Sequence, residues 1–537
     1  MCSTRKSVHT HLPKEGRTKL LNRGRWWALA VLDLCLLAIT IDNTIMNVAL
    51  PTLARELHAT GTELQWIVDA YVLFWAGLLL TAGTLGDRIG RRRVLLIGLG
   101  MLGVGAVASS FASSASELIA TRALMGAAAA FIMPATLSIL TNLFDEHERP
   151  KAIATWSAVS GVGMVLGPIA GGWLLDNFAW SSIFLANLPI VAIGAIGTLA
   201  LVPESRDAHP DAADPIGAGL SIAGLMALVY GIIEAPNAGW TSPETLVRIG
   251  AGLAVLVVFL VWEIRSRAPM LDVRLFLRPR FGPPALAISA GFFAIAGGTF
   301  MLTQYLQFVR GMRPLEAGVA LLPVAIGVVV GTALASRLLR PLGTKIVMGT
   351  AMAVMAVGLL LASRLGADSP YEALAACLLL ISIGLGLGSM PGTDSIMGAV
   401  PKDRAGVGSA TNDTTREIGC ALGVAVLGSV LSSGYRDAIG DQLAGLGPTL
   451  NETVRDSIGA ATGVAHSLPG AAGAEVARIA NDAFIGGMSG AMVIAAIVVA
   501  AASAVLFAWL PARAPGYEPR AEADAGSAGA QAAGAAD

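Results

Sequence analysis

Ionisable side chains inside long apolar segments are the residues of this sequence most able to do chemistry. Asp42, Asp69 and Arg122 interrupt apolar segments near its start, and Asp413 and Glu417 share one helical face of a later segment. A carboxylate in a low-dielectric cavity is protonated more readily than one in water, and it releases its proton when water or a cation arrives. These acids are therefore candidates for binding a proton and a cation in turn, without covalent catalysis.

Each of these groups also has a simpler explanation. Asp69 can be an interfacial acid, solvated at the outer end of its helix beside Trp66. Asp42 can be paired with Arg122, because a buried arginine needs a partner or water, and it would then be a structural or proton-relay group. Arg416 can form an internal pair with the acids of its own segment. The sequence leaves these alternatives open.

These side chains must be positioned by membrane-spanning helices. The 537 residues are 55% hydrophobic and 14% charged, with a mean hydropathy of +0.68, and this composition excludes a soluble core. A crossing helix needs about 20 apolar residues. We predict roughly fourteen such spans, at 27–50, 66–85, 94–112, 118–143, 152–174, 182–202, 216–235, 247–264, 281–308, 316–337, 345–363, 372–397, 409–432 and 483–510.

A highly charged string, GTLGDRIGRRR from Gly83 to Arg93, separates two of these spans. Charges at the bilayer centre cost several kcal/mol each, so this loop must lie at a membrane face and turn the chain back. Its glycines allow a tight turn, and Asp87 can accept hydrogen bonds from helix amides or a neighbouring guanidinium, as in a breakable latch. The alternative is a topology signal without a conformational role.

The distribution of basic residues predicts the orientation in the membrane. Lysines and arginines gather in the N-terminal arm and in alternate loops, which should therefore be cytoplasmic, and an even number of spans places the C-terminus there too. No cleavable signal peptide is apparent. A formal net charge of -1 gives no indication of a nucleic-acid partner, and the four isolated cysteines suggest neither disulfides nor a metal site.

Three strings resemble motifs of the major facilitator superfamily of secondary transporters. The charged loop resembles the one between helices 2 and 3 of these proteins, LIATRALMG at 118–126 resembles their helix 4 motif, and GMVLGPIAGG resembles the antiporter motif of exporting members. The resemblance implies two six-helix halves that face each other across a central cavity. It also implies a conformational switch in the loop, formed by Gly83, Asp87, Arg88, Gly90, Arg91 and Arg92.

Three further strings resemble drug:proton antiporter family 2, the fourteen-helix branch that exports quaternary ammonium compounds and other lipophilic cations. They are IDNTIMNVALP at 41–51, LQWIVDAY at 64–71 and NDTTREIG at 412–419, and the resemblance extends over nearly the whole chain. WSSIF at 180–184 departs from the WR-type string of the family, so the contacts of the outer gate are not carried over. The resemblance implies proton-coupling and substrate-binding roles for Asp42, Asp69, Arg122, Asp413 and Glu417.

The antiporter motif in the fifth span comprises Gly163, Gly167, Pro168, Gly171 and Gly172. Glycines four residues apart flatten one helix face and let a neighbour pack closely, while a proline removes a backbone donor and bends the helix. We predict a tight pivot that can seal one side of the transporter. Ordinary small-residue packing, with no bias toward export, is the alternative.

The resemblance also implies the organisation of the chain. It begins with a cytoplasmic basic arm (1–26) and a six-helix bundle (27–202). A linker with two extra transmembrane helices (203–280) leads to a second six-helix bundle (281–510), which includes an external helical loop at 434–482. A disordered cytoplasmic tail (511–537) follows. The segment from Gly331 to Lys345 supports the duplication, since it echoes the charged loop but lacks its acid.

The expected function is proton-coupled efflux of lipophilic cationic compounds by alternating access, in the plasma membrane. The alternatives are a dedicated exporter of one antibiotic or metabolite and, from another class, a membrane receptor that does not transport. No constellation of nucleophile, base and metal ligands indicates an enzyme. We expect no cofactor or metal besides the coupling protons, a small lipophilic substrate, the lipid bilayer as surroundings, no nucleic-acid partner, and a monomer.

Overall fold

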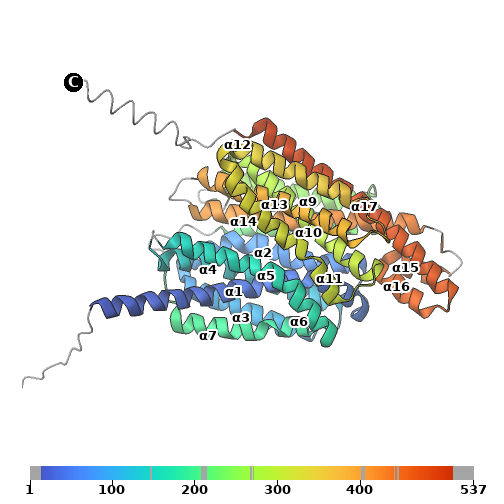
Figure 1. Ribbon diagram of the computed structural model, residues 1–537, viewed down its shortest axis with the longest axis horizontal. Coiled ribbons are helices and arrows are strands. Elements are labelled where there is room, and N and C mark those ends of the chain that lie inside the picture. Colours follow the sequence, from blue (N-terminus) through green and yellow to red (C-terminus); the bar gives the residue numbers. More distant parts are fainter. Residues whose placement is uncertain are drawn as a thin grey trace, which may run out of the picture.

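The computed structural model of the chain describes residues 14–145, 148–206, 214–266, 269, 271–400, 405–440, 442–443 and 447–511. Its regular elements within these ranges are all helices, which confirms the predicted all-α fold (Figure 1). Part of the predicted arm at 1–26, part of the linker at 203–280 and almost all of the predicted tail at 511–537 lie outside the described residues.

The first half of the molecule is built around α1, which packs against α5 and α7, and α4, which packs against α2 and α3. Long apolar stretches form these helices, and polar caps start two of them: Thr60 and Glu63 form a capping box before α2, and Ser114 caps α4. The helices are α1 (Lys14–Glu56), α2 (Gly61–Ile89), α3 (Arg91–Ser110), α4 (Ala115–Leu143), α5 (Arg149–Asn177), α6 (Ser182–Leu185) and α7 (Asn187–Leu201).

The second half follows in the order α10, α11, α12, α13, α14 and α17 and occupies the upper part of Figure 1. α10 ends in one π-helical turn, Tyr305–Val309, a form frequent at functional sites. The bounds of these helices are α10 (Gly282–Gln304), α11 (Pro314–Ala320), α12 (Leu322–Ala362), α13 (Tyr371–Gly398), α14 (Ala405–Ile439) and α17 (Ala471–Trp509).

Each of the fourteen predicted spans coincides with a helical stretch. Within the described residues, thirteen helices are long and apolar enough to cross a membrane, because the stretch Pro314–Ala362 counts as one. This stretch reverses at Gly343, where φ is 78°, so that Gly327 and Gly358 approach adjacent residues of α13, Ser382 and Ile381. It therefore supplies two of the predicted spans.

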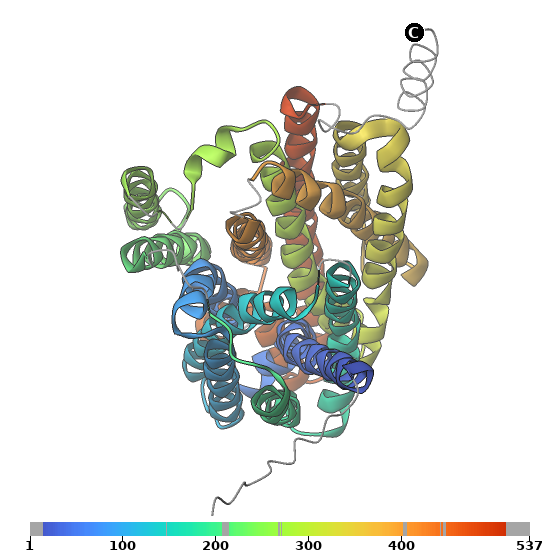
Figure 2. The same ribbon diagram turned by 90° about the vertical axis from the view of Figure 1, so that its left-hand side faces the viewer.

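The two surplus helices, α8 (Pro215–Ala238) and α9 (Pro243–Arg265), form a pair beside the seam between the halves. α8 packs against both α2 and α14, and Figure 2 shows the green pair on that side of the bundle. Ser429 of α14 donates a hydrogen bond to the Ile232 carbonyl oxygen of α8 at 2.9 Å. A short 3-10 helix, Val273–Leu277, precedes α10.

A helical hairpin stands at the end of the bundle where α1 ends (Figure 1). It consists of α15 (Pro448–Asp456) and α16 (Ile458–Ser467) and lies within the segment 434–482 that was predicted to be an external loop, although α14 and α17 extend farther toward it than the predicted spans. The halves meet at this end. Gln307 of the π turn donates a hydrogen bond to the Val48 carbonyl oxygen of α1 at 2.8 Å, and Gly318 of α11 packs against Pro168 of α5.

Candidate functional site

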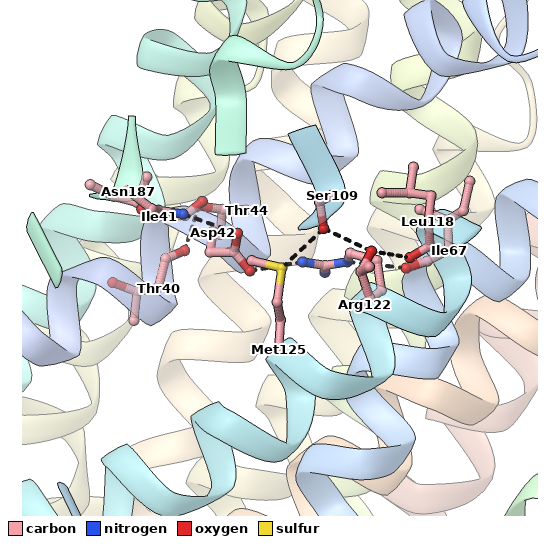
Figure 3. A network of polar contacts seen from close by, with 11 residues as sticks. Thr40, Ile41, Asp42, Thr44, Ile67, Ser109, Leu118, Arg122, Met125 and Asn187 are labelled. Carbon is pink, nitrogen blue, oxygen red and sulfur yellow. Dashed lines mark hydrogen bonds and ion pairs between the residues drawn. The ribbon is translucent and has the colours of Figure 1, made fainter. Parts of the chain in front are cut away.

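Asp42 and Arg122 form an ion pair in the centre of the first half (Figure 3). The Arg122 Nη1 to Asp42 Oδ2 distance is 2.7 Å, and both side chains are 0% exposed. The second carboxylate oxygen, Oδ1, accepts a hydrogen bond from Nδ2 of Asn187 at 3.0 Å. Both oxygens of Asp42 are thus occupied by N–H donors. This geometry supports the pairing alternative for Asp42.

Arg122 is held from two further directions. Its Nε donates to the Ile67 carbonyl oxygen at 3.2 Å, and its guanidinium carbon lies 4.1 Å from the centre of the Tyr71 ring. α4 can come this close to α2 because Gly126, one turn after Arg122, has no side chain: a Cβ there would overlap the Tyr71 backbone. The arginine therefore connects α1, α2 and α4 rigidly.

Asp69 has an environment unlike that of Asp42. It is 0% exposed, and neither of its carboxylate oxygens has a hydrogen-bond partner among the described residues. The alternative of a solvated, interfacial acid is therefore wrong: Asp69 lies on the buried face of α2, which packs against α14. A carboxylate without hydrogen-bond donors in such a place is costly when charged.

On α14, Arg416 pairs with Asp413 rather than with Glu417. The Arg416 Nη1 to Asp413 Oδ1 distance is 3.9 Å, and the guanidinium donates to Thr393 Oγ1 of α13 at 3.0 Å. The guanidinium carbon also lies 5.4 Å from the centre of the Phe292 ring of α10. Glu417 Oε2 is buried and has no hydrogen-bond partner within the described ranges.

The acids of the two halves approach each other across the seam between α2 and α14. Cys420, one turn after Glu417, lies within electrostatic range of both Glu417 and Asp69. Tyr71 lies within range of Asp42, Arg122 and Glu417. The structure thus brings together Asp42, Asp69, Arg122 and Glu417, with Asp413 one turn farther along α14.

The charged loop between α2 and α3 is bound within its own half. Asp87 accepts hydrogen bonds from Nε and Nη2 of Arg91 at 2.9 and 2.7 Å. The backbone N–H of Arg92 donates to Glu204 Oε1 at 3.2 Å, and Glu204 thereby places an anion at the N-terminus of α3. Gly90 has a φ of 114°, and a Cβ there would lie 2.5 Å from the Glu204 carboxylate. Only glycine fits this turn.

The antiporter motif packs as its spacing predicts. Gly163 and Gly167 of α5 lie directly against Thr40 and Thr44 of α1, and Thr44 Oγ1 donates to the Gly163 carbonyl oxygen at 3.3 Å. Gly171 packs against Ile45 in the same way. The other face of α5 meets the second half, because a Cβ on Gly172 would lie 2.5 Å from the Cα of Leu315. Pro168, adjacent to Gly167, contacts Gly318 on this same face.

Three residues that make these contacts were not predicted from the sequence: Asn187, Glu204 and Phe292. A polar residue such as Asn187 inside an apolar segment is a signal that could have been read, since a buried amide needs partners. Nothing in the sequence distinguishes Phe292 from other aromatic residues. Within the part of the chain that the structure describes, no group of three His, Cys, Asp or Glu side chains could hold a metal ion.

Comparisons with known proteins agree with this architecture. The family model of the Major Facilitator Superfamily matches residues 32–424. The inward-facing, unoccupied crystal structure of a bacterial homologue of the human lysosomal transporter Spinster has a TM-score of 0.63 and 18% identity. The match covers 91% of this chain and 99% of that chain. At this identity the likeness shows the fold.

Relatives with higher identity are resistance and efflux proteins. The multidrug efflux pump LfrA of Mycolicibacterium smegmatis is 36% identical over 482 residues, 90% of this chain and 95% of that protein. The methyl viologen resistance protein SmvA of Salmonella typhimurium is 32% identical, over 86% and 93% of the two chains.

The tetracenomycin C resistance and export protein of Streptomyces glaucescens is 30% identical, over 92% of this chain and 93% of that protein. The family match covers more than half of the chain, and these relatives align with nearly all of it. The chain therefore belongs to the major facilitator superfamily, a family of transporters, and is related to the members of its drug:proton antiporter family 2.

Proposed function

We propose that this protein is a proton-coupled antiporter that exports lipophilic cations across the cell membrane by alternating access. The names of its relatives support export of drugs, and methyl viologen is itself a cation. The basic residues of the charged loop favour a cytoplasmic position for that end of the bundle, and so for both termini. The hairpin of α15 and α16 then lies outside the cell.

The observation that carries this proposal is the contrast between Asp69 and Asp42. Asp42 is neutralised by Arg122 at 2.7 Å, and each of its carboxylate oxygens already accepts from an N–H donor. Asp69 is equally buried but unpartnered, and it lies beside the seam that must rearrange when the halves rock. A carboxylate of this kind holds a proton or a cation, but not both, which is the requirement for exchange.

The order of the exchange steps depends on which end of the bundle is closed. The halves contact each other through α1, α5, α10 and α11 at the end that bears the hairpin, so substrate enters from the end of the charged loop. At that end the acids release their protons to the less acidic cytoplasm as the substrate cation replaces them. Opening of the outer end releases the cation and reloads the protons, whose inward movement supplies the free energy.

The test is efflux of ethidium and tetraphenylphosphonium from energised cells, with and without a proton uncoupler. We expect uncoupler-sensitive efflux by the wild type and its loss in Asp69→Asn and Glu417→Gln, at equal amounts of folded protein. Asp394→Asn is a matched control for Glu417→Gln, because Asp394 is an exposed acid of the same half as Glu417. Efflux that continues in Asp69→Asn with the same uncoupler sensitivity would exclude Asp69 as a coupling group.

A dedicated antibiotic exporter is the second candidate, favoured by the relative named for tetracenomycin C resistance and export. The same experiment distinguishes the two. If the folded wild type exports neither cation but protects cells from a neutral or anionic antibiotic, the acids serve only as proton carriers.

A further inference from the structure

The contacts of Arg416 resemble those that a bound cation would make. Its guanidinium lies 5.4 Å from the centre of the Phe292 ring, within the range of a cation–π interaction, and Nη1 lies 3.9 Å from a carboxylate oxygen of Asp413. An aromatic face attracts a cation through its ring quadrupole and a carboxylate attracts it through its charge, so the two together can bind a lipophilic cation. In this structure an arginine of the protein occupies that site.

Arg416 is held loosely in comparison with Arg122. Its Nε has no hydrogen-bond partner among the described residues, and its one hydrogen bond is to the Thr393 hydroxyl at 3.0 Å. The Arg416 and Asp413 side chains are 28% and 18% exposed, whereas Arg122 and Asp42 are 0% exposed. A long, partly exposed side chain with so few contacts can move away, and Asp413, left without its counterion, then attracts another cation.

Glu417 offers the place to which Arg416 can move. It lies one turn after Asp413 on the same face of α14, its Oε2 has no hydrogen-bond partner in the described part of the chain, and Asp413 and Arg416 are the charged groups of this helix that act on it. From α2, Tyr71 and Asp69 face the same region, directly or through Cys420. The elements α10 and α13 present the neutral Phe292 and Thr393.

We propose that Phe292 and Asp413 form the seat for the cationic group of the substrate, and that Arg416 occupies this seat until Glu417 loses its proton and draws the guanidinium away. This rests on the proposed function. In the occupied state Glu417 is neutral and Arg416 balances Asp413. After the proton leaves to water, Arg416 balances Glu417 and the substrate cation balances Asp413.

The net charge of these groups is therefore zero in both states. Binding of a monovalent cation is linked to the release of one proton from Glu417, and no uncompensated charge is left in the cavity. The arrangement also explains why an arginine can lie beside the acids of a cation site. A fixed guanidinium would repel the substrate, while a displaceable one makes substrate binding depend on the protonation state of Glu417.

The test is binding of tetraphenylphosphonium to the purified full-length protein between pH 5 and 8, roughly the range of a buried carboxyl. We expect the wild-type affinity to rise with pH. Arg416→Gln should bind about tenfold more tightly at low pH and lose most of this dependence, because the internal competitor is gone. Glu417→Gln should bind weakly at every pH, because Arg416 stays on Phe292.

Substitutions of Phe292 test the seat itself. Phe292→Leu keeps an apolar side chain but removes the aromatic face, and we expect about three- to tenfold weaker binding, with Phe292→Trp restoring it. The Phe292→Leu effect should be larger in the Arg416→Gln background, where only the substrate uses the ring.

The outcomes separate this inference from the proposed function. If wild-type protein binds the cation but Arg416→Gln binds it more weakly at all pH values, Arg416 is a structural residue and the displacement is wrong. If Asp69→Asn, rather than Glu417→Gln, abolishes the pH dependence, the proton-linked group is Asp69 and the inference is overturned while antiport stands. If the wild type binds no cation at any pH, both fail.

Discussion

At the scale of single residues, two buried aspartates of the first half have opposite surroundings. Asp42 accepts from Arg122 and Asn187, whereas both oxygens of Asp69 lack a hydrogen-bond partner in the described residues. Removing one member of a buried ion pair leaves an uncompensated charge, but removing an unpartnered acid leaves none. Substitution of Asp42 should therefore mainly lower stability, whereas substitution of Asp69 should mainly impair transport.

Asp69→Asn should fold as well as the wild type and lose proton-coupled efflux. Asp42→Asn should lower the free energy of unfolding by about 3–5 kcal/mol, because the Arg122 charge stays buried without its counterion. Thermal unfolding of the purified proteins in detergent, measured beside efflux in cells, checks both statements. A larger loss of stability in Asp69→Asn than in Asp42→Asn would show that the assignment of roles is reversed.

The pairing of Asp42 with Arg122 also predicts a rescue. Arg122→Gln alone should destabilise the protein strongly, since it leaves the Asp42 carboxylate buried with only Asn187 as donor. The double variant Asp42→Asn with Arg122→Gln should be more stable than either single variant, because no buried charge remains. Thermal unfolding of the four proteins gives the coupling between the two sites. Additive losses would mean that the 2.7 Å contact carries no net coupling.

At the scale of elements, the charged loop is attached to the segment that leads into the surplus helices. Its partner in this structure is Glu204, which follows α7 and lies before α8; Arg93 Nε is 3.7 Å from the Glu204 carboxylate. The loop is thus held by its own half in a structure whose halves meet at the end that bears the hairpin. Separation of the halves at that end has to change this attachment if the loop acts as the predicted switch.

Loss of the Glu204 carboxylate should loosen the loop. Glu204→Gln removes the anion at the N-terminus of α3, an effect of about 0.5–2 kcal/mol, while Glu204→Asp keeps the charge. We expect trypsin to cleave at Arg91–Arg93 several-fold faster in inverted membranes of Glu204→Gln than in the wild type. Equal cleavage rates in all three proteins would mean that Glu204 does not hold the loop.

Gly90→Ala should be defective for two separable reasons. The alanine would have to adopt a φ of 114°, which costs of order 1–3 kcal/mol, and its Cβ would collide with Glu204. Combination with Glu204→Ala removes the collision and leaves the backbone strain. Efflux assays of the single and double variants should therefore show partial rescue; complete rescue would mean that backbone strain at Gly90 is unimportant.

The elements were predictable from the sequence to a greater extent than the site. Long apolar runs indicate membrane spans, and the glycine spacing of α5 indicates close packing. The spans and the packing of Gly163 and Gly167 could therefore be predicted from the sequence. The partners of Arg122 and Arg416 lie on other helices, and their distances depend on how α1, α4, α10 and α14 cross. For that reason the sequence left Asp42 undecided and gave no indication of Phe292.

At the scale of the whole molecule, the hairpin of α15 and α16 bridges both halves at the closed end. A Cβ on Gly459 of α16 would lie 3.2 Å from the Ala54 Cβ of α1 and 3.1 Å from Cζ of Phe308 in the π turn of α10. With the hydrogen bond from Gln307 to Val48 and the packing of Gly318 on Pro168, it joins the halves at this end. Alternating access requires that all these contacts separate together.

A disulfide between Ala54→Cys and Gly459→Cys should therefore stop transport. The expected Cβ separation of 3.2 Å is close to the roughly 3.5–4.5 Å of a disulfide, so a small shift of α16 is sufficient for oxidation. We expect efflux by the double variant to be lost on oxidation and regained on reduction, while each single variant stays active under both conditions. The single variants control for Cys35, Cys377 and Cys420, which are free thiols. If the oxidised, fully cross-linked protein still exports substrate at the wild-type rate, the hairpin moves with α1, and the outer end opens between the hairpin and α10 instead.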